Sequence, residues 1–320
     1  MDPTPLGFVT RQGSDLFYPD GKLLKFASMN VPDIFNVQDI PDRRGTRYLT
    51  DPYEVRDAVQ SIWGLGGQVF RTYTFGFGPQ YHETSPGVYS EEAFRVVDNV
   101  IAEAGRMDVK VIIPFINNGK DLNETWSYGT YAHFSQMRQK PAEAFFTDPQ
   151  LIADFKGFIS FVLNRRNTIN GVIYKNDTAI LGWQLGNELG GWKDPTPPAN
   201  WTLDIARHIK TEDTNHLVID GTLAGHDRSR WPVEALRSPY LDVFSNHYYW
   251  GIDDIKSGRI EKDADYVASF NKAFIITEFG LSSIDVYQKI FDLVARKKIS
   301  GALLWSLRFH AEKGALFFSF

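Results

Sequence analysis

The chain has 320 residues, of which 43% are hydrophobic and 23% charged, and this balance is typical of one large domain spanning residues 1–320. The formal net charge of -5 gives no positive field for phosphates, which argues against nucleic acids and anionic membrane surfaces as partners and favours a neutral substrate. Cysteine is absent, which excludes disulfides, thiolate metal sites and a cysteine nucleophile. No apolar run reaches the roughly 18 residues expected of a membrane span, and the first residues lack a signal-peptide pattern.

A hairpin is predicted first, from Phe8 to Leu24, with a turn at Pro19-Asp20-Gly21. Eight strand-like runs then follow along the chain. Their nearly continuous apolar character is typical of parallel strands that are buried on both faces. The eight runs are Leu23–Asn30, Gln68–Phe75, Val109–Asn117, Ala179–Glu188, His216–Thr222, Leu241–Tyr249, Ala273–Gly280 and Ser300–His310.

Helices are predicted between these runs, because apolar residues recur there at three- and four-residue spacing. Asp51-Pro52 and Asp148-Pro149 each place Asp at an N-cap and Pro in the first turn. Strand and helix alternation without a Gly-x-Gly-x-x-Gly turn after the first strand predicts an α/β fold, a closed (β/α)₈ barrel with the hairpin across its bottom. The predicted helices are Pro52–Leu65, Glu91–Met107, Pro149–Arg166, Trp201–Glu212 and Ile284–Lys297, with shorter ones near Val233–Arg237 and Lys262–Asn271.

Two glutamates stand at the ends of apolar strands. Glu188 follows the fourth run, after Asn187, and Glu278 ends the seventh. Because the carboxyl ends of the strands form the functional face of such a barrel, both should face one cleft from opposite sides. A single glutamate of this kind is better explained as a helix cap or a surface ion pair. Two of them favour hydrolysis of a glycosidic bond, and a separation of about 5 Å implies a covalent glycosyl-enzyme route.

Five short motifs occur in order at the ends of the expected strands. They are Arg71 in Val-Phe-Arg-Thr, Gly-Asn-Glu at 186–188, His-Tyr-Tyr at 247–249, Thr-Glu-Phe-Gly at 277–280 and Trp305 in Leu-Leu-Trp-Ser. With this order the chain resembles glycoside hydrolase family 5, especially its endo-β-1,4-mannanase branch, from Phe8 to about His310. The resemblance implies a retaining glycoside hydrolase that cleaves β-1,4-mannosidic bonds in mannan, galactomannan or glucomannan by double displacement.

The resemblance also implies roles for individual residues. Glu188 is the expected general acid/base and Glu278 the expected nucleophile, while Asn187 is expected to bond the sugar 2-hydroxyl. Arg71 is expected to keep Glu278 ionised through charge-assisted hydrogen bonds. Taken alone, Arg71 could equally form a structural salt bridge.

His247 and Tyr249 are two residues apart on the sixth strand, so their side chains should point the same way, and the Tyr249 hydroxyl could donate to Glu278. A lone histidine is more often a core residue. Trp305 is the expected floor of the central sugar subsite, with barrel packing as the alternative. Loop tryptophans are candidates for outer subsites, although at least one should only pack its loop; these are Trp126, Trp192 and Trp250.

Neither a metal nor another cofactor is expected, since the histidines lie on separate strands or loops and no His-x-x-x-His spacing occurs. The expected partner is a β-linked polysaccharide. A β-1,4-glucanase or an exo-β-mannosidase of the same fold remains an alternative, as does a truncated, impaired sugar-binding protein. The resemblance implies an extracellular location, while the sequence leaves a cytoplasmic one open.

The chain's end departs from the family pattern. After Leu-Arg-Phe-His at 307–310, family members continue into a final helix, whereas here an apolar stretch at 314–320 follows. The final helix is therefore expected to be missing. Uncovered strands would favour self-association or lower stability.

Overall fold

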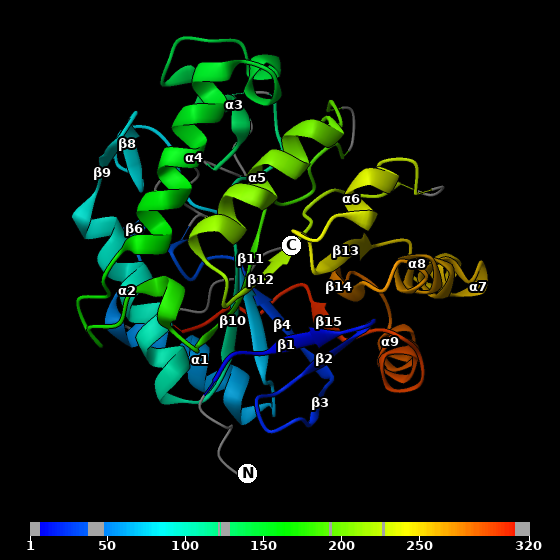
Figure 1. Cartoon of the computed structure of the whole chain (residues 1–320). Coiled ribbons are helices and arrows are strands. Elements are labelled where there is room, and N and C mark those ends of the chain that lie inside the picture. Colours follow the sequence, from blue (N-terminus) through cyan, green and yellow to red (C-terminus); the bar gives the residue numbers. More distant parts are fainter. Residues whose placement is uncertain are drawn as a thin grey trace.

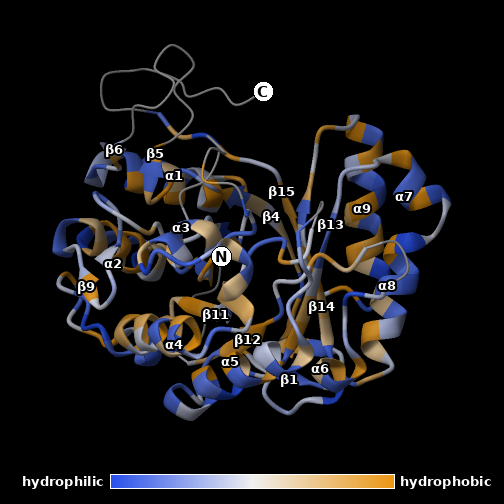
Figure 2. Cartoon of the chain, turned by 90° about the horizontal axis from the view of Figure 1, so that it is seen from above, coloured by the Kyte–Doolittle hydropathy of each residue, from blue (hydrophilic) through white to orange (hydrophobic). Residues whose placement is uncertain are grey.

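The computed structural model describes residues 7–37, 48–120, 122, 129–191, 194–225 and 228–310. Eight parallel strands form a closed barrel, in which each strand pairs with both neighbours (Figure 1). Helices surround this barrel when it is seen from above (Figure 2). The fold is therefore a TIM-type barrel, and each of the eight predicted runs overlaps one barrel strand. These strands are β4 (Phe26–Val31), β7 (Val69–Thr72), β10 (Lys110–Pro114), β11 (Ile180–Gln184), β12 (Leu217–Ile219), β13 (Val243–Tyr248), β14 (Ala273–Phe279) and β15 (Gly301–Leu304).

The helices follow the predicted alternation. None in the described part of the chain combines the length and apolar character needed to cross a bilayer. The α-helices are α1 (Pro52–Gly64), α2 (Glu91–Arg106), α3 (Tyr131–Gln136), α4 (Pro149–Asn164), α5 (Ala199–Glu212), α6 (Val233–Arg237), α7 (Ile252–Lys256), α8 (Arg259–Ala268) and α9 (Ile284–Arg296). Two short 3₁₀ turns are η1 (Ala142–Phe146) and η2 (Tyr174–Asn176).

The predicted helix starts at Asp51 and Asp148 are confirmed. Asp51 accepts from the Glu54 backbone in a full capping box, and Asp148 accepts from two backbone amides of the first turn. The long helices agree with the predicted bounds to within two residues, and three shorter segments differ more. Helix α8 begins three residues early at Arg259, α7 was not predicted, and α3 with η1 occupies a segment left without elements. These are short helices, which carry little apolar periodicity.

The N-terminal hairpin has a third strand, so the predicted first run divides. Strands β1 (Thr10–Gln12), β2 (Asp15–Phe17) and β3 (Leu23–Leu24) form an antiparallel sheet, and the barrel strand β4 starts after Lys25. Leu16 and Leu24 are fully buried in one cluster with Val69, Ile112 and Ile275 from the barrel strands. This apolar contact holds the sheet against the amino-terminal end of the barrel, opposite the strand ends that carry the predicted catalytic residues.

Two further two-stranded sheets lie in loops after barrel strands. They pair β5 (Asn36–Val37) with β6 (Tyr48–Leu49), and β8 (Glu83–Ser85) with β9 (Val88–Tyr89). The predicted lack of a final helix falls on residues 311–320, which lie outside the described residues. The extent of the domain over 1–320 stays a prediction.

Glu83 is a buried carboxyl group in the β8–β9 hairpin. It is 1% exposed, and its Oε1 accepts from the Gly87 amide at 2.7 Å. Its Oε2 is buried with no hydrogen-bond partner among the described residues. Burial raises the pKa of Glu83 from 4.5 to about 7, so the folded chain holds this proton at pH values where an unfolded chain has lost it.

We therefore expect the fold to lose stability as the pH rises through about 7. The raised pKa of Glu83 in the folded chain stabilises the fold fully below 4.5, the unfolded pKa. This stabilisation is lost as the pH rises through the folded pKa of about 7. Between about pH 5 and 9, the free energy of unfolding of the parent should fall by on the order of 2 to 3 kcal/mol more than that of Glu83→Gln. Urea unfolding at several pH values measures this difference. The exposed Glu92→Gln should behave like the parent, and a Glu83→Gln curve parallel to the parent curve would refute the assignment.

Candidate active site

The predicted functional residues meet at the carboxyl-terminal ends of the barrel strands. Arg71 lies in β7 and Glu278 in β14, while Glu188 lies in the turn after β11. That turn depends on close backbone contact: a Cβ added at Gly221 would lie only 1.8 Å from the carbonyl oxygen of Gly186. Glu188 itself has φ = 52°, in the left-handed region that few non-glycine residues adopt.

The guanidinium of Arg71 is the centre of a buried hydrogen-bond network, with 0% exposure. Nη1 donates to Glu278 Oε1 at 2.8 Å and to Asn30 Oδ1 at 3.1 Å. Nε donates to Gln184 Oε1 at 2.7 Å, and Nη2 donates to Asn187 Oδ1 at 2.5 Å. The contact predicted between Arg71 and Glu278 is therefore present, and it is a charge-assisted one.

Glu278 also receives a hydrogen bond on its other oxygen. The Tyr249 hydroxyl donates to Oε2 at 2.7 Å, as the spacing on strand β13 predicted. Burial and the negative charge of Glu278 raise the pKa of Tyr249, so this hydroxyl stays a donor. Arg71 and Tyr249 thus hold both carboxylate oxygens of Glu278 in place.

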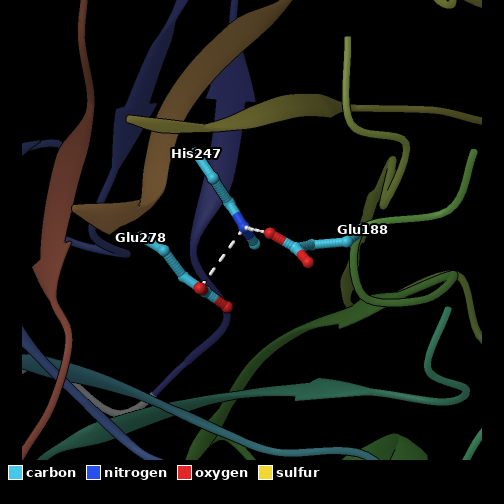
Figure 3. A group of neighbouring side chains, drawn as sticks. All are labelled: Glu188, His247 and Glu278. Atoms are coloured by element: carbon cyan, nitrogen blue, oxygen red, sulfur yellow. Dashed lines mark hydrogen bonds and ion pairs between the residues drawn. The ribbon is translucent and has the colours of Figure 1, made fainter. Parts of the chain in front are cut away.

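His247 lies between the two glutamates (Figure 3). Its Nδ1 is 2.8 Å from Glu188 Oε1 and 3.3 Å from Glu278 Oε2. One ligand-type atom from each of Glu188, His247 and Glu278 lies within 4.8 Å of the other two. The two carboxyl groups are therefore close neighbours at one end of the barrel, although 90 residues separate them in sequence.

Such a triad has the donor types of a metal site, which the sequence spacing did not reveal. The charge next to it disfavours that use. Arg71 already places a permanent cation 2.8 Å from Glu278, and a divalent ion bound there would face this positive charge. The arrangement fits proton and carboxylate chemistry better than metal binding.

A second branch of the network runs through Asn187. Its Nδ2 donates to Asn117 Oδ1 at 2.8 Å, and Asn117 Nδ2 donates to the Tyr73 hydroxyl at 3.0 Å. The Tyr73 ring meets the Trp305 ring edge-on, with centroids 5.9 Å apart. Arg71, Asn187, Asn117 and Tyr73 therefore link Glu278 to the aromatic pair that contains Trp305.

Of the three predicted loop tryptophans, one lies among the described residues. Trp250 lies two residues after the end of the barrel strand β13, as predicted, and is 64% exposed. Trp126 and Trp192 lie outside the described residues, so their predicted roles stay predictions.

Sequence reasoning missed four members of the network, namely Asn30, Tyr73, Asn117 and Gln184. Two of them carried a signal. Asn30 and Gln184 lie within otherwise apolar barrel strands, where a buried polar side chain requires a partner.

Comparison with known proteins agrees with this geometry. A family model described as GH family 5 beta-mannosidase-like matches residues 79–283. Putative mannan endo-1,4-beta-mannosidase 4 of Arabidopsis thaliana is 34% identical over 309 residues, covering 81% of this chain and 76% of that protein. Putative mannan endo-1,4-beta-mannosidase 5 of Oryza sativa subsp. japonica is 29% identical over 257 residues. That match covers 77% of this chain and 50% of the rice protein, so the chain spans half of that protein's length.

A solved structure shows the same fold. The endo-1,4-beta-mannanase from Rhizomucor miehei superposes with a TM-score of 0.78 at 24% identity, and the match covers 94% of this chain and 90% of that one. The family match spans most of the chain and includes both glutamates at the barrel end. The chain belongs to the GH family 5 beta-mannosidase-like family and is a mannanase-like glycoside hydrolase.

Proposed function

We propose that this chain is a retaining endo-β-1,4-mannanase in which Glu278 is the nucleophile and Glu188 the general acid/base. The observation that carries this proposal is the short distance, within 4.8 Å, between carboxyl oxygens of the two residues. Retaining glycosidases keep their carboxyl groups roughly 5 to 5.5 Å apart, whereas inverting enzymes leave roughly 6.5 to 9.5 Å for a water molecule. The names of the curated relatives support mannan as the substrate.

The environments of the two carboxyl groups support this division of roles. The Glu278 side chain is 5% exposed and receives hydrogen bonds from Arg71 and Tyr249, which fix its oxygens and stabilise negative charge. The Glu188 side chain is 16% exposed. A nucleophile benefits from fixed geometry, while an acid/base must exchange protons with a leaving group and with water.

The reaction follows from this placement in two steps. A Glu278 oxygen attacks the anomeric carbon as the bond to the leaving sugar breaks, and the Glu188 proton moves to the leaving oxygen. Glu188, now a carboxylate, then takes a proton from water as the water oxygen attacks the same carbon, which releases Glu278. The sugar leaves with its original anomeric configuration.

Substrate choice is tested by comparing rates on galactomannan, glucomannan and carboxymethylcellulose. We expect hydrolysis of the two mannans, with short oligosaccharides of mixed length as early products. Release of single mannose units would instead indicate an exo-β-mannosidase, and a preference for carboxymethylcellulose would indicate a β-1,4-glucanase. Inactivity on all three would overturn the proposed function.

Glu278→Ala should reduce hydrolysis by roughly 10⁴-fold or more, because the atom that bonds the anomeric carbon is gone. Added azide should restore cleavage of an aryl β-mannoside and give the glycosyl azide of inverted configuration, which nuclear magnetic resonance identifies. Glu92→Ala, an exposed change on α2, is the matched control and should act like the parent. Turnover near the parent rate in Glu278→Ala would contradict the nucleophile assignment.

Glu188→Ala should have a different signature. Its glycosylation step should slow by roughly 10²- to 10⁴-fold on polysaccharide but much less on aryl glycosides with good leaving groups, since these need little acid assistance. Azide should then yield the glycosyl azide of retained configuration, formed on the second step. Pre-steady-state rates on both substrate types measure the contrast, and an equal loss on both would argue against Glu188 as the acid.

A further inference from the structure

The hydrogen-bond chain from Arg71 to Tyr73 has a fixed direction. A guanidinium can only donate, so the Asn187 atom facing Arg71 must be its oxygen, and its amide nitrogen must face Asn117. The Asn117 atom that accepts this bond is then its oxygen, so its nitrogen faces the Tyr73 hydroxyl. Arg71 thereby settles the orientation of two side-chain amides that could otherwise be flipped.

This direction determines what Tyr73 can do. Its hydroxyl oxygen is occupied as an acceptor of the Asn117 N–H at 3.0 Å, which leaves its own hydrogen to donate elsewhere. None of the described residues accepts that hydrogen. Burial, followed by the charges of Glu278 and Glu188, raises the pKa of Tyr73, so the hydroxyl keeps its proton.

The position of this donor points to the substrate. Tyr73 directly follows β7, two residues after Arg71, and is partly exposed with its ring edge-on to Trp305. A sugar bound against Trp305 would present its hydroxyl groups beside this phenol. A donor that finds no acceptor among the described residues, and that lies near the Glu278 and Glu188 carboxyl groups, is suited to a sugar hydroxyl or ring oxygen.

We propose that Tyr73 is a specificity-determining residue whose hydroxyl donates a hydrogen bond to one hydroxyl of the sugar bound against Trp305. Asn117 is the positioning residue, because its N–H occupies the acceptor side of the Tyr73 hydroxyl and so directs the hydroxyl hydrogen toward the sugar. The proposal rests on the proposed function. It differs from a packing role for Tyr73, because packing uses the ring, while recognition uses the hydroxyl hydrogen.

The test uses aryl β-mannosides that each lack one ring hydroxyl, or the matching β-glucosides if the parent prefers glucan. Tyr73→Phe keeps the ring and removes the donor. On the complete sugar it should lose about 3- to 10-fold in kcat/KM, the value of one hydrogen bond between neutral groups. On the sugar that lacks the partner hydroxyl, Tyr73→Phe and the parent should be equally active, while on the others the loss should persist.

The matched control is Tyr266→Phe on α8, whose ring packs against Phe270 away from the barrel end. It should equal the parent on every sugar. A Tyr73→Phe enzyme with no loss, or with the same loss on every deoxy sugar, would overturn the proposal while the parent's activity still supports the proposed function. A parent inactive on all glycosides would overturn both.

Asn117→Asp tests whether Asn117 orients the Tyr73 hydroxyl. Aspartate can still accept from Asn187 but offers no N–H, so the Tyr73 hydroxyl should turn and donate to the new carboxylate. The hydrogen bond to the sugar would then be lost. The part of the difference in kcat/KM between the complete sugar and that deoxy sugar that depends on Tyr73 should then disappear. The added charge shifts the pH profile, so each variant is assayed at its own optimum. Retained discrimination in Asn117→Asp would refute the role of Asn117.

Discussion

The active end of the barrel is organised by one buried cation. Arg71 is fully buried, and removing a charge from water is costly unless hydrogen bonds and an opposite charge compensate for it. The compensation comes from four side chains on three barrel strands and the turn after β11: Asn30, Gln184, Asn187 and Glu278. Each of these residues is constrained in type because each must present an acceptor. The need to satisfy Arg71 therefore determines which polar residues can end these strands.

The donor-only character of Arg71 also orients the groups one step further away. Asn30 turns its nitrogen toward backbone carbonyls of β14 and β15, and Gln184 donates to the Ser245 hydroxyl, which in turn donates to a backbone carbonyl. Those two branches end on the protein's own backbone. The third branch ends on Tyr73, whose hydroxyl hydrogen has no acceptor in the part of the chain that the structure describes. In such an aligned network, each hydrogen bond polarises and strengthens its neighbours, and this holds for the branch that leads to Tyr73 as well.

The barrel could be predicted because its strands are apolar on both faces and its long helices are capped by Asp51 and Asp148. Glu188 and Glu278 could be found because charged residues end apolar runs. The network around them could not be derived in full. Asn117 meets Asn187 through a parallel bridge beyond the ends of β10 and β11, and a single sequence does not reveal which residues stand side by side in neighbouring strands. The same lack of register hid the contact of Asn117 with Tyr73.

The two glutamates also differ in the backbone conformation of the segments in which they lie. Glu278 lies inside β14, where it pairs with His247 of β13, so its backbone belongs to the barrel ladder. Glu188 comes four residues after the end of β11, in a turn with a left-handed backbone conformation. Under the proposed function, the strand would hold the Glu278 oxygen that bonds the anomeric carbon, and the turn would present the Glu188 carboxyl group to the leaving oxygen and to water. This difference in backbone setting agrees with the proposed roles of Glu278 as nucleophile and Glu188 as acid/base.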